Sequence, residues 1–228
     1  MFNLDVIAVS LVGYLVGSIP FAVILAKRRG VDVYEVGSGN PGATNVTRHV
    51  GKGFGLLVFF LDFLKGLFAT WWFRFEFFVI PPEDPIFLAM CGMVASVLGH
   101  SFPVYSRFRG GKGVATTMGA LLVVFPEALA VGLLVWLFLF LWLRYVSLAS
   151  IGFGASLPIT VLFCEWFVFE AYEHPYLKVG FAAAIGVWIL IRHHENVARL
   201  LTGEENKFSG EKKKKKKKES STLNQSNE

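Results

Sequence analysis

The chain has 228 residues, of which 54% are hydrophobic, and its mean hydropathy is +0.54. This composition is too apolar for a soluble domain and predicts one compact all-helical membrane domain. The formal net charge of +5 comes largely from the lysine run at 212–218, so nucleic-acid binding has little support. The two cysteines, Cys91 and Cys164, lie in apolar runs far from any His or Asp cluster, which argues against a metal site.

Apolar stretches predict seven transmembrane helices. A helix needs about 20 apolar residues to cross the hydrocarbon core, although a segment buried in protein can be shorter. We place the boundary between the fourth and fifth helices at Pro126, because proline breaks a helix and suits the first turn of the next. The predicted spans are 3–26, 54–79, 85–104, 114–125, 127–143, 147–169 and 175–191.

The distribution of basic residues predicts the orientation. Lys and Arg gather on the side shared by the connection after the first span and the C-terminal end, with Lys65, Arg74 and Lys178 as exceptions. Since cytoplasmic loops carry an excess of basic residues, we expect the N-terminus outside and the C-terminus in the cytoplasm.

The first cytoplasmic connection contains "GSGNPGATNVTR" at 37–48. Glycines allow backbone conformations with positive φ, the small polar side chains supply hydrogen-bond donors, and Arg48 adds a cation. Taken alone, a glycine-rich loop between membrane helices is more often a simple turn.

The second polar stretch, "GHSFPVYSRFRGGKGVATT" at 99–117, leads into the fourth predicted span. Its centre, residues 110–113, combines three glycines with Lys112 at a helix N-terminus, where backbone N–H groups favour a bound anion. The spacing is not that of a Walker A loop, because a glycine and not Ser or Thr follows Lys112.

The third stretch is "HHENVARLLTGEENKF" at 193–208. We predict a helix that continues out of the seventh span and carries His193 and Asn196 on one face, which can turn toward the two loops. The coincidence of three such stretches on one side favours a phosphate site over a metal site or a site for a cationic substrate. The side chains gathered there are those of Ser38, Asn40, Thr44, Asn45, Arg48, His100, Lys112, His193 and Asn196.

Asp62 and Lys65 lie three residues apart inside the second predicted span. Charges within a membrane are expensive, so we expect the two side chains to pair and to face the bundle interior. A structural ion pair is the interpretation we favour, and a transport pathway is the alternative. A small anion transporter would carry phosphate-type groups on both faces or internal repeats, and neither is found.

Five motifs, in this order, resemble those of the bacterial acyl-phosphate:glycerol-3-phosphate acyltransferases, the PlsY family. They are "GSIPFA" (17–22), "GSGNPGATNVTR" (37–48), "DFLKG" (62–66), "GHSFPVYSRFRGGKGVAT" (99–116) and "HHENVARLLTGEE" (193–205). The resemblance implies a seven-helix enzyme of the bacterial inner membrane whose active site faces the cytoplasm. Such enzymes move a fatty acyl group from acyl phosphate to the 1-hydroxyl of sn-glycerol 3-phosphate, giving lysophosphatidic acid and inorganic phosphate, the first step of phospholipid synthesis.

The partners that the resemblance implies are the two substrates and membrane lipids. Neither acyl-CoA nor acyl carrier protein is the direct donor, and no cofactor or obligatory protein partner is expected. None of the five histidines is followed five residues later by an acidic residue, which excludes the His-x-x-x-x-Asp mechanism of other glycerolipid acyltransferases.

We assign catalytic roles to Ser38, Arg48 and Lys112, which would bind phosphate, and by resemblance to His193 and Asn196. The residues expected to bind or shape the substrate phosphates are Gly39, Asn40, Thr44, Asn45, His100, Gly110, Gly111 and Gly113. The hydroxyl proton has two candidate acceptors: His193, whose ordinary pKa suits a general base, and a substrate phosphate oxygen, which we favour. The division of residues between donor and acceptor phosphate stays open.

The chain departs from the family pattern at its end. We expect an acyltransferase domain at 1–208 and a disordered lysine-rich cytoplasmic tail at 209–228, which catalysis does not need. Attraction of the lysines to an anionic leaflet is the alternative for the tail. The roles of Glu204 and Glu205 stay open, because "GEENKF" differs from the form typical of the family.

Overall fold

The computed structural model describes residues 4–74, 84–167 and 175–208, and all regular secondary structure in these ranges is helical. Two short 3₁₀ helices span Trp72–Arg74 and Val104–Ser106. The ends of the predicted spans at 79 and 169, and the predicted tail at 209–228, lie outside the described residues. The α-helices are α1 Leu4–Gly17, α2 Phe21–Lys27, α3 Ala43–His49, α4 Lys52–Trp71, α5 Pro85–Ser101, α6 Val114–Val124, α7 Pro126–Leu143, α8 Val146–Phe167, α9 Pro175–Arg192 and α10 His194–Leu201.

Five helical segments of the described chain are long and apolar enough to cross a membrane, and α9 with α10 makes a sixth if that bent pair is one span. The five are Leu4–Lys27, Lys52–Arg74, Pro85–Ser106, Pro126–Leu143 and Val146–Phe167. The remaining predicted span is α6, which has 11 residues and buries most of them. A helix enclosed by protein does not need the full length that lipid-facing helices need.

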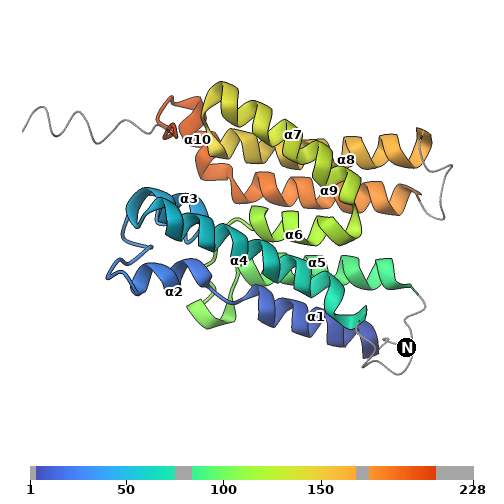
Figure 1. Ribbon diagram of the computed structural model, residues 1–228. Coiled ribbons are helices and arrows are strands. Elements are labelled where there is room, and N and C mark those ends of the chain that lie inside the picture. The colour runs from blue at the N-terminus through green and yellow to red at the C-terminus, as the bar shows by residue number, and fades with distance from the viewer. Residues whose placement is uncertain (1–3, 75–83, 168–174, 209–228) are drawn as a thin grey trace, which may run out of the picture.

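The helices form two groups joined through α6. Helix α1 packs on α5 and α4 packs on α6, while α7 and α9 both pack on α8. Figure 1 shows α6 between the group of α1 to α5 and the group of α7 to α10. The core runs through this junction, with fully buried Met93, Leu121, Phe153, Leu157 and Ile189.

Local signals explain where two of the helices begin. The carboxylate of Asp84 accepts a hydrogen bond from the backbone N–H of Phe87 at 2.9 Å, and Pro85 occupies the first turn of α5. Pro126 begins α7 directly after α6 ends at Val124, so the predicted boundary between these helices is confirmed.

The first predicted span is not one continuous helix, because it breaks after Gly17 and resumes as α2 at Phe21. Pro20 accounts for the break, since it has no N–H group and its ring clashes with the carbonyl four residues earlier. The carbonyl of Ile19 at the break accepts a hydrogen bond from Lys65 Nζ at 3.1 Å, which ties the break to α4.

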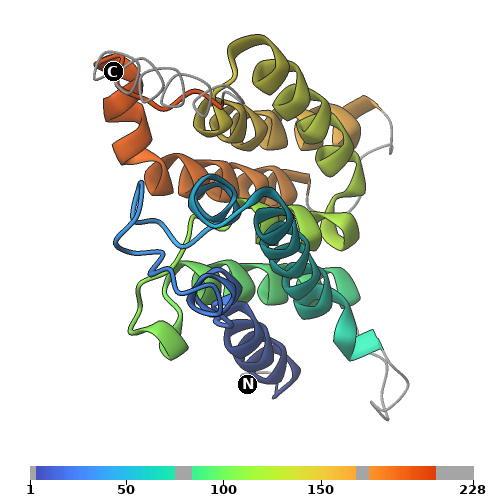
Figure 2. The ribbon, with the colours of Figure 1, turned by 60° about the vertical axis from the view of Figure 1, so that its left-hand side comes forward.

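The prediction that a helix continues straight through His193 is wrong: α9 ends at Arg192 and α10 starts at an angle of 60° (Figure 2). The ring Nδ1 of His193 lies 2.7 Å from the carbonyl oxygen of Ile189, and its backbone N–H donates to Leu190. The side chain thus takes the carbonyl that the helical backbone would use, and such competition interrupts helices.

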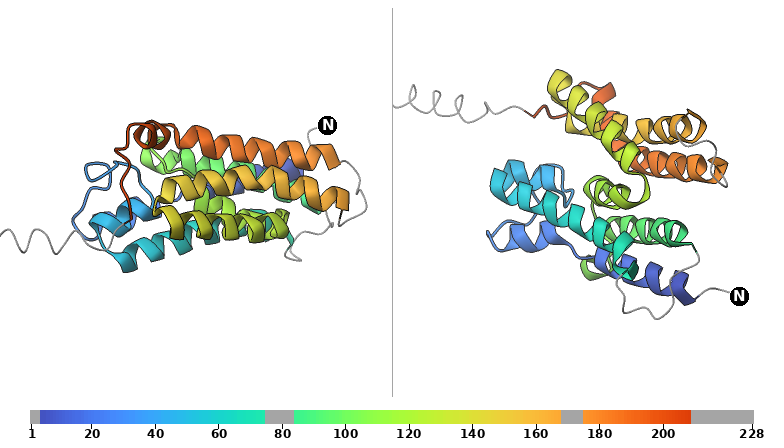
Figure 3. Two further views of the ribbon diagram at one scale, coloured as in Figure 1. Left: turned by 90° about the horizontal axis from the view of Figure 1, so that it is seen from above. Right: turned by 45° about the vertical axis from the view of Figure 1, so that its right-hand side comes forward.

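Polar segments far apart in the sequence meet at one end of the bundle. Figure 3 (left) shows α2, α3 and α10 at this end and the N-terminus at the opposite end. The polar stretches at 37–48 and 193–208 therefore lie at the same end of the bundle, as the sequence predicts.

Candidate active site

Residues from the three polar stretches line one cavity of about 260 Å³ at this end. Ten of the predicted site residues line it, namely Ser38, Asn40, Thr44, Asn45, Arg48, His100, Lys112, Gly113, His193 and Asn196. The structure therefore places together, in one hollow, side chains that are separated by up to 158 positions in the sequence.

The loop before α3 forms the rim of the cavity. Gly37 and Gly39 both have positive φ, +60° and +65°, which glycine adopts at no steric cost. The buried amide of Asn45 donates hydrogen bonds to the carbonyls of Val33 and Val36, both at 3.0 Å, and so braces the loop from within. Asn45 therefore shapes the site through the loop that carries Ser38.

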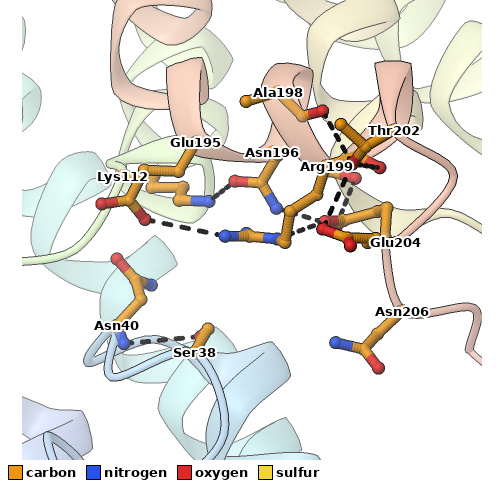
Figure 4. A network of polar contacts seen from close by, with 12 residues as sticks. Ser38, Asn40, Lys112, Glu195, Asn196, Ala198, Arg199, Thr202, Glu204 and Asn206 are labelled. Carbon is orange, nitrogen blue, oxygen red and sulfur yellow. Dashed lines mark hydrogen bonds and ion pairs between the residues drawn. The ribbon is translucent and has the colours of Figure 1, made fainter.

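A chain of hydrogen bonds joins the other two stretches across the cavity (Figure 4). The ammonium of Lys112 donates to Asn196 Oδ1, and Asn196 Nδ2 donates to Glu205 Oε1 at 2.8 Å. Glu205 also accepts from Ser147 at 2.7 Å and from Arg199 at 2.9 Å. Glu205 therefore fixes the Asn196 amide so that its oxygen faces Lys112.

Three basic side chains line the cavity, those of Arg48, Lys112 and Arg199, and Arg199 is paired with Glu205. Burial lowers the pKa of Lys112 to about 8, while the carboxylate of Glu205 opposes this shift and Arg199 adds to it. Arg48 donates to the carbonyl oxygen of Asn206 at 3.0 Å and lies over the ring of Phe208 at 6.0 Å. Burial is the main cause of the lowered pKa of Lys112, and a bound anion would stabilise its ammonium form.

His193 is buried, with 4% of its surface exposed, and it lines the cavity. Because Nδ1 lies 2.7 Å from a carbonyl oxygen, which can only accept, the neutral ring carries its proton on Nδ1. Nε2 then bears the lone pair, which can accept a hydrogen bond or a proton from a hydroxyl group.

Asp62 and Lys65 form a buried ion pair, with 2.9 Å between Lys65 Nζ and Asp62 Oδ1. His100 Nδ1 lies 3.6 Å from the same carboxylate oxygen, and both Asp62 and His100 line the cavity. The prediction that the two charges pair and face the interior is confirmed, and the pair supports the end of α5 that carries His100.

Three predicted residues lie outside the cavity lining: Gly39, Gly110 and Gly111. The N–H group of Gly111 donates to the carbonyl oxygen of His100 at 3.1 Å, so it is not available to a ligand. A Cβ atom at Gly110 would lie 2.2 Å from the His100 carbonyl oxygen, and one at Gly111 would lie 2.2 Å from His100 Nε2. These two glycines serve close packing of the loop on α5.

The segment after α10 contributes residues that the sequence left without a role. Glu205 and Asn206 line the cavity, as does Arg199 within α10. Gly203, with a φ of +74°, turns the chain back toward α3 and brings them there. A glycine directly after a helix is a signal for such a turn, but its direction depends on the bend at His193. Among the described residues, no group of three or more His, Cys, Asp or Glu could hold a metal ion.

The fold and the cavity define an integral membrane protein with a cation-bearing site suited to phosphorylated molecules. The family model described as glycerol-3-phosphate acyltransferase matches residues 7–203. Two curated proteins of that name, from Aquifex aeolicus (strain VF5) and Hydrogenobaculum sp. (strain Y04AAS1), are 48% and 43% identical over 204 and 200 residues. These alignments cover 86% and 87% of this chain and 95% of each relative.

A crystal structure of PlsY, an integral membrane glycerol 3-phosphate acyltransferase in its glycerol 3-phosphate form, has 45% identity and a TM-score of 0.76. The match covers 90% of this chain and 96% of the solved one. A second structure, of the lysophosphatidic acid form, matches with a TM-score of 0.74. This chain therefore belongs to the PlsY family of glycerol-3-phosphate acyltransferases, as its motifs predict, and it is an enzyme. The alternative of an anion transporter is not favoured.

Proposed function

We propose that the acyl donor is a fatty acyl phosphate and that the group is transferred to the 1-hydroxyl of sn-glycerol 3-phosphate, releasing lysophosphatidic acid and inorganic phosphate. The observation that carries this proposal is the meeting of Arg48, Lys112 and the rim residue Ser38 in one cavity. Both substrates carry a phosphate, so a site with separate cations and many donors suits the pair. Apolar Phe59, Met118 and Trp136 line the same cavity, which suits a fatty acyl group.

In the proposed reaction the hydroxyl oxygen attacks the acyl carbonyl carbon, and the bond between that carbon and the phosphate oxygen breaks. Negative charge develops on the carbonyl oxygen and on the departing phosphate, and the fixed charges of Arg48 and Lys112 stabilise it. The hydroxyl proton passes to a phosphate oxygen, while Nε2 of His193 accepts the hydrogen bond that orients the hydroxyl. His193 itself is the alternative acceptor of that proton.

The remaining predicted residues take supporting roles in this proposal. Ser38 and Asn40 lie on the rim opposite α10, where their side chains can bind a phosphate oxygen (Figure 4). Thr44 and Gly113 line the wall, and Asn196 holds the Lys112 ammonium in place.

The proposed topology has seven crossings, with α6 as the enclosed short one, the N-terminus outside and the active site facing the cytoplasm of a bacterial inner membrane. Basic residues near α2, α5 and α10 lie at the end of the bundle that holds the cavity, which supports this orientation. Single cysteines replacing Arg29, Arg107 and Thr202, in a variant lacking Cys91 and Cys164, should react with an impermeant thiol reagent only after the cells are opened. Reaction in intact cells would overturn the orientation.

The donor is tested with purified protein in detergent. Phosphate release should require both acyl phosphate and glycerol 3-phosphate, and acyl-CoA offered in place of acyl phosphate should give no lysophosphatidic acid. Turnover with acyl-CoA alone as donor would contradict the proposal, whereas phosphate release without glycerol 3-phosphate would indicate a hydrolase.

A further inference from the structure

Arg192, the last residue of α9, contacts the glycine loop without lining the cavity. Its guanidinium donates hydrogen bonds to the carbonyl oxygens of Gly111 at 2.9 Å and Gly110 at 3.3 Å. The same group lies 5.3 Å from the centre of the Phe102 ring, at the end of α5. Arg192 thus contacts the loop from outside the cavity.

Holding these carbonyls determines where the loop amides point. In a trans peptide the C=O and N–H groups point in opposite directions, so the N–H of Lys112 points away from Arg192 when the Gly111 carbonyl points toward it. Within the described ranges, the backbone N–H groups of Lys112 and Gly113 have no hydrogen-bond partner, although both residues line the cavity. These two donors are therefore left for a ligand.

The loop is held from two sides. His100 on α5 accepts from the Gly111 N–H at 3.1 Å, and Arg192 on α9 donates to the two glycine carbonyls. Among the described residues no carboxylate forms an ion pair with Arg192, and its Nε is buried without a hydrogen-bond partner. Carbonyl oxygens neutralise a cation less than a carboxylate does, so Arg192 adds positive potential behind the loop.

We infer that Arg192 is a positioning residue for the phosphate-binding loop: it holds the carbonyls of Gly110 and Gly111 so that the amide of Lys112 faces one substrate phosphate, next to the free amide of Gly113. It acts through the loop and does not contact substrate. Because His193 follows it directly, the same turn also sets the distance between the loop and the His193 ring. This inference rests on the proposed function, in which Lys112 of this loop stabilises the charge of a phosphate.

The first test separates positioning from packing by steady-state kinetics. In R192Q the KM of the substrate whose phosphate the loop holds should rise about tenfold, the value of one or more hydrogen bonds to a charged group, while the KM of the other substrate stays near its original value. R192K keeps the charge but not the planar donor group, so its KM for that substrate should lie between those of the parent and of R192Q. R107Q removes an exposed arginine before the same loop and should match the parent enzyme.

Two results would overturn the inference. In the first, R192Q has the same KM values as the parent enzyme. In the second, R192Q yields less active protein while both KM values stay unchanged, which is the result that a packing role predicts. A second readout does not need turnover. At one fixed concentration, inorganic phosphate should raise the unfolding temperature of the parent and of R107Q more than that of R192Q, because the variant binds it about tenfold more weakly. Equal stabilisation of all three would refute the role of Arg192 even if the assignment of the acyl donor failed.

Discussion

The charge state of Lys112 predicts how kcat/KM depends on pH. Its pKa in the folded protein, about 8, is lower than its ordinary value of 10.5, so the ammonium form is lost as the pH rises through about 8. Because that ammonium binds phosphate in the proposed mechanism, kcat/KM should fall above pH 8. Phosphate monoesters titrate near pH 6, so the substrates do not account for a decline at this pH.

The matched variant is K112R. A guanidinium stays charged throughout this range, so the alkaline decline should disappear, although the absolute rate should fall because the Asn196 contact is changed. An identical alkaline decline in K112R would show that another group titrates.

At the residue scale, the sequence predicts the side chains that line the cavity better than the residues that hold them in place. Ser38, Arg48 and Lys112 stand in short polar stretches of an apolar chain, where their chemistry is apparent. In the sequence, Arg192 is an ordinary basic residue at the end of an apolar run. Glu205 lies in "GEENKF", which differs from the form typical of the family. Glu205 reaches its partners because the chain bends at His193 and turns at Gly203, and neither direction can be read from residue types.

At the scale of elements, close contact between α4 and α6 places the glycine loop. A Cβ atom at Gly66 would lie 2.0 Å from the Thr116 carbonyl oxygen, and one at Gly119 would lie 1.9 Å from that of Phe63. Each obstacle is backbone, so G66A and G119A must separate the helices, at a cost of about 1–3 kcal/mol in the free energy of unfolding. Both variants should unfold at lower temperature in detergent.

The control for this prediction is G180A on α9, where an added Cβ meets nothing within 4 Å. It should leave the unfolding temperature unchanged or raise it slightly, because alanine favours helix more than glycine does. If G66A and G119A had the same unfolding temperature as G180A, the close contact between α4 and α6 would be contradicted.

The sequence predicts helix boundaries well where an apolar run ends, and less well where a helix breaks or bends inside a run. Pro126 marks the boundary between α6 and α7, because the run on each side is long enough to be a helix of its own. Pro20 and His193 interrupt helices inside runs whose apolar character continues, so hydropathy alone does not reveal those breaks. At His193 the cause is a bond from the side chain to the backbone, which depends on a rotamer and not on composition.

At the scale of the whole molecule, the segment 203–208 closes one side of the cavity. The N–H of Phe208 donates to the Arg144 carbonyl at 2.7 Å, and its ring lies 5.6 Å from that of Phe140. Truncation after Gly210 should therefore keep full turnover, as expected if the lysine-rich tail is dispensable. Truncation after Thr202 removes Glu205 and Phe208, and should reduce turnover strongly while insertion into the membrane is retained.

Equal turnover by both truncated chains would show that the segment does not support the site. Loss of turnover on truncation after Gly210 would instead favour a role for the lysine run in binding the membrane surface.

The central claim is that cations from distant segments meet in one cavity to hold two phosphorylated substrates. The most direct measurement is phosphate release by R48A and K112A, purified in detergent, with acyl phosphate and glycerol 3-phosphate both present. Each variant should lose at least about 100-fold in turnover, because each removes a fixed charge from the developing negative charge, while expression and membrane insertion stay intact. Unaltered turnover in both variants would contradict the site.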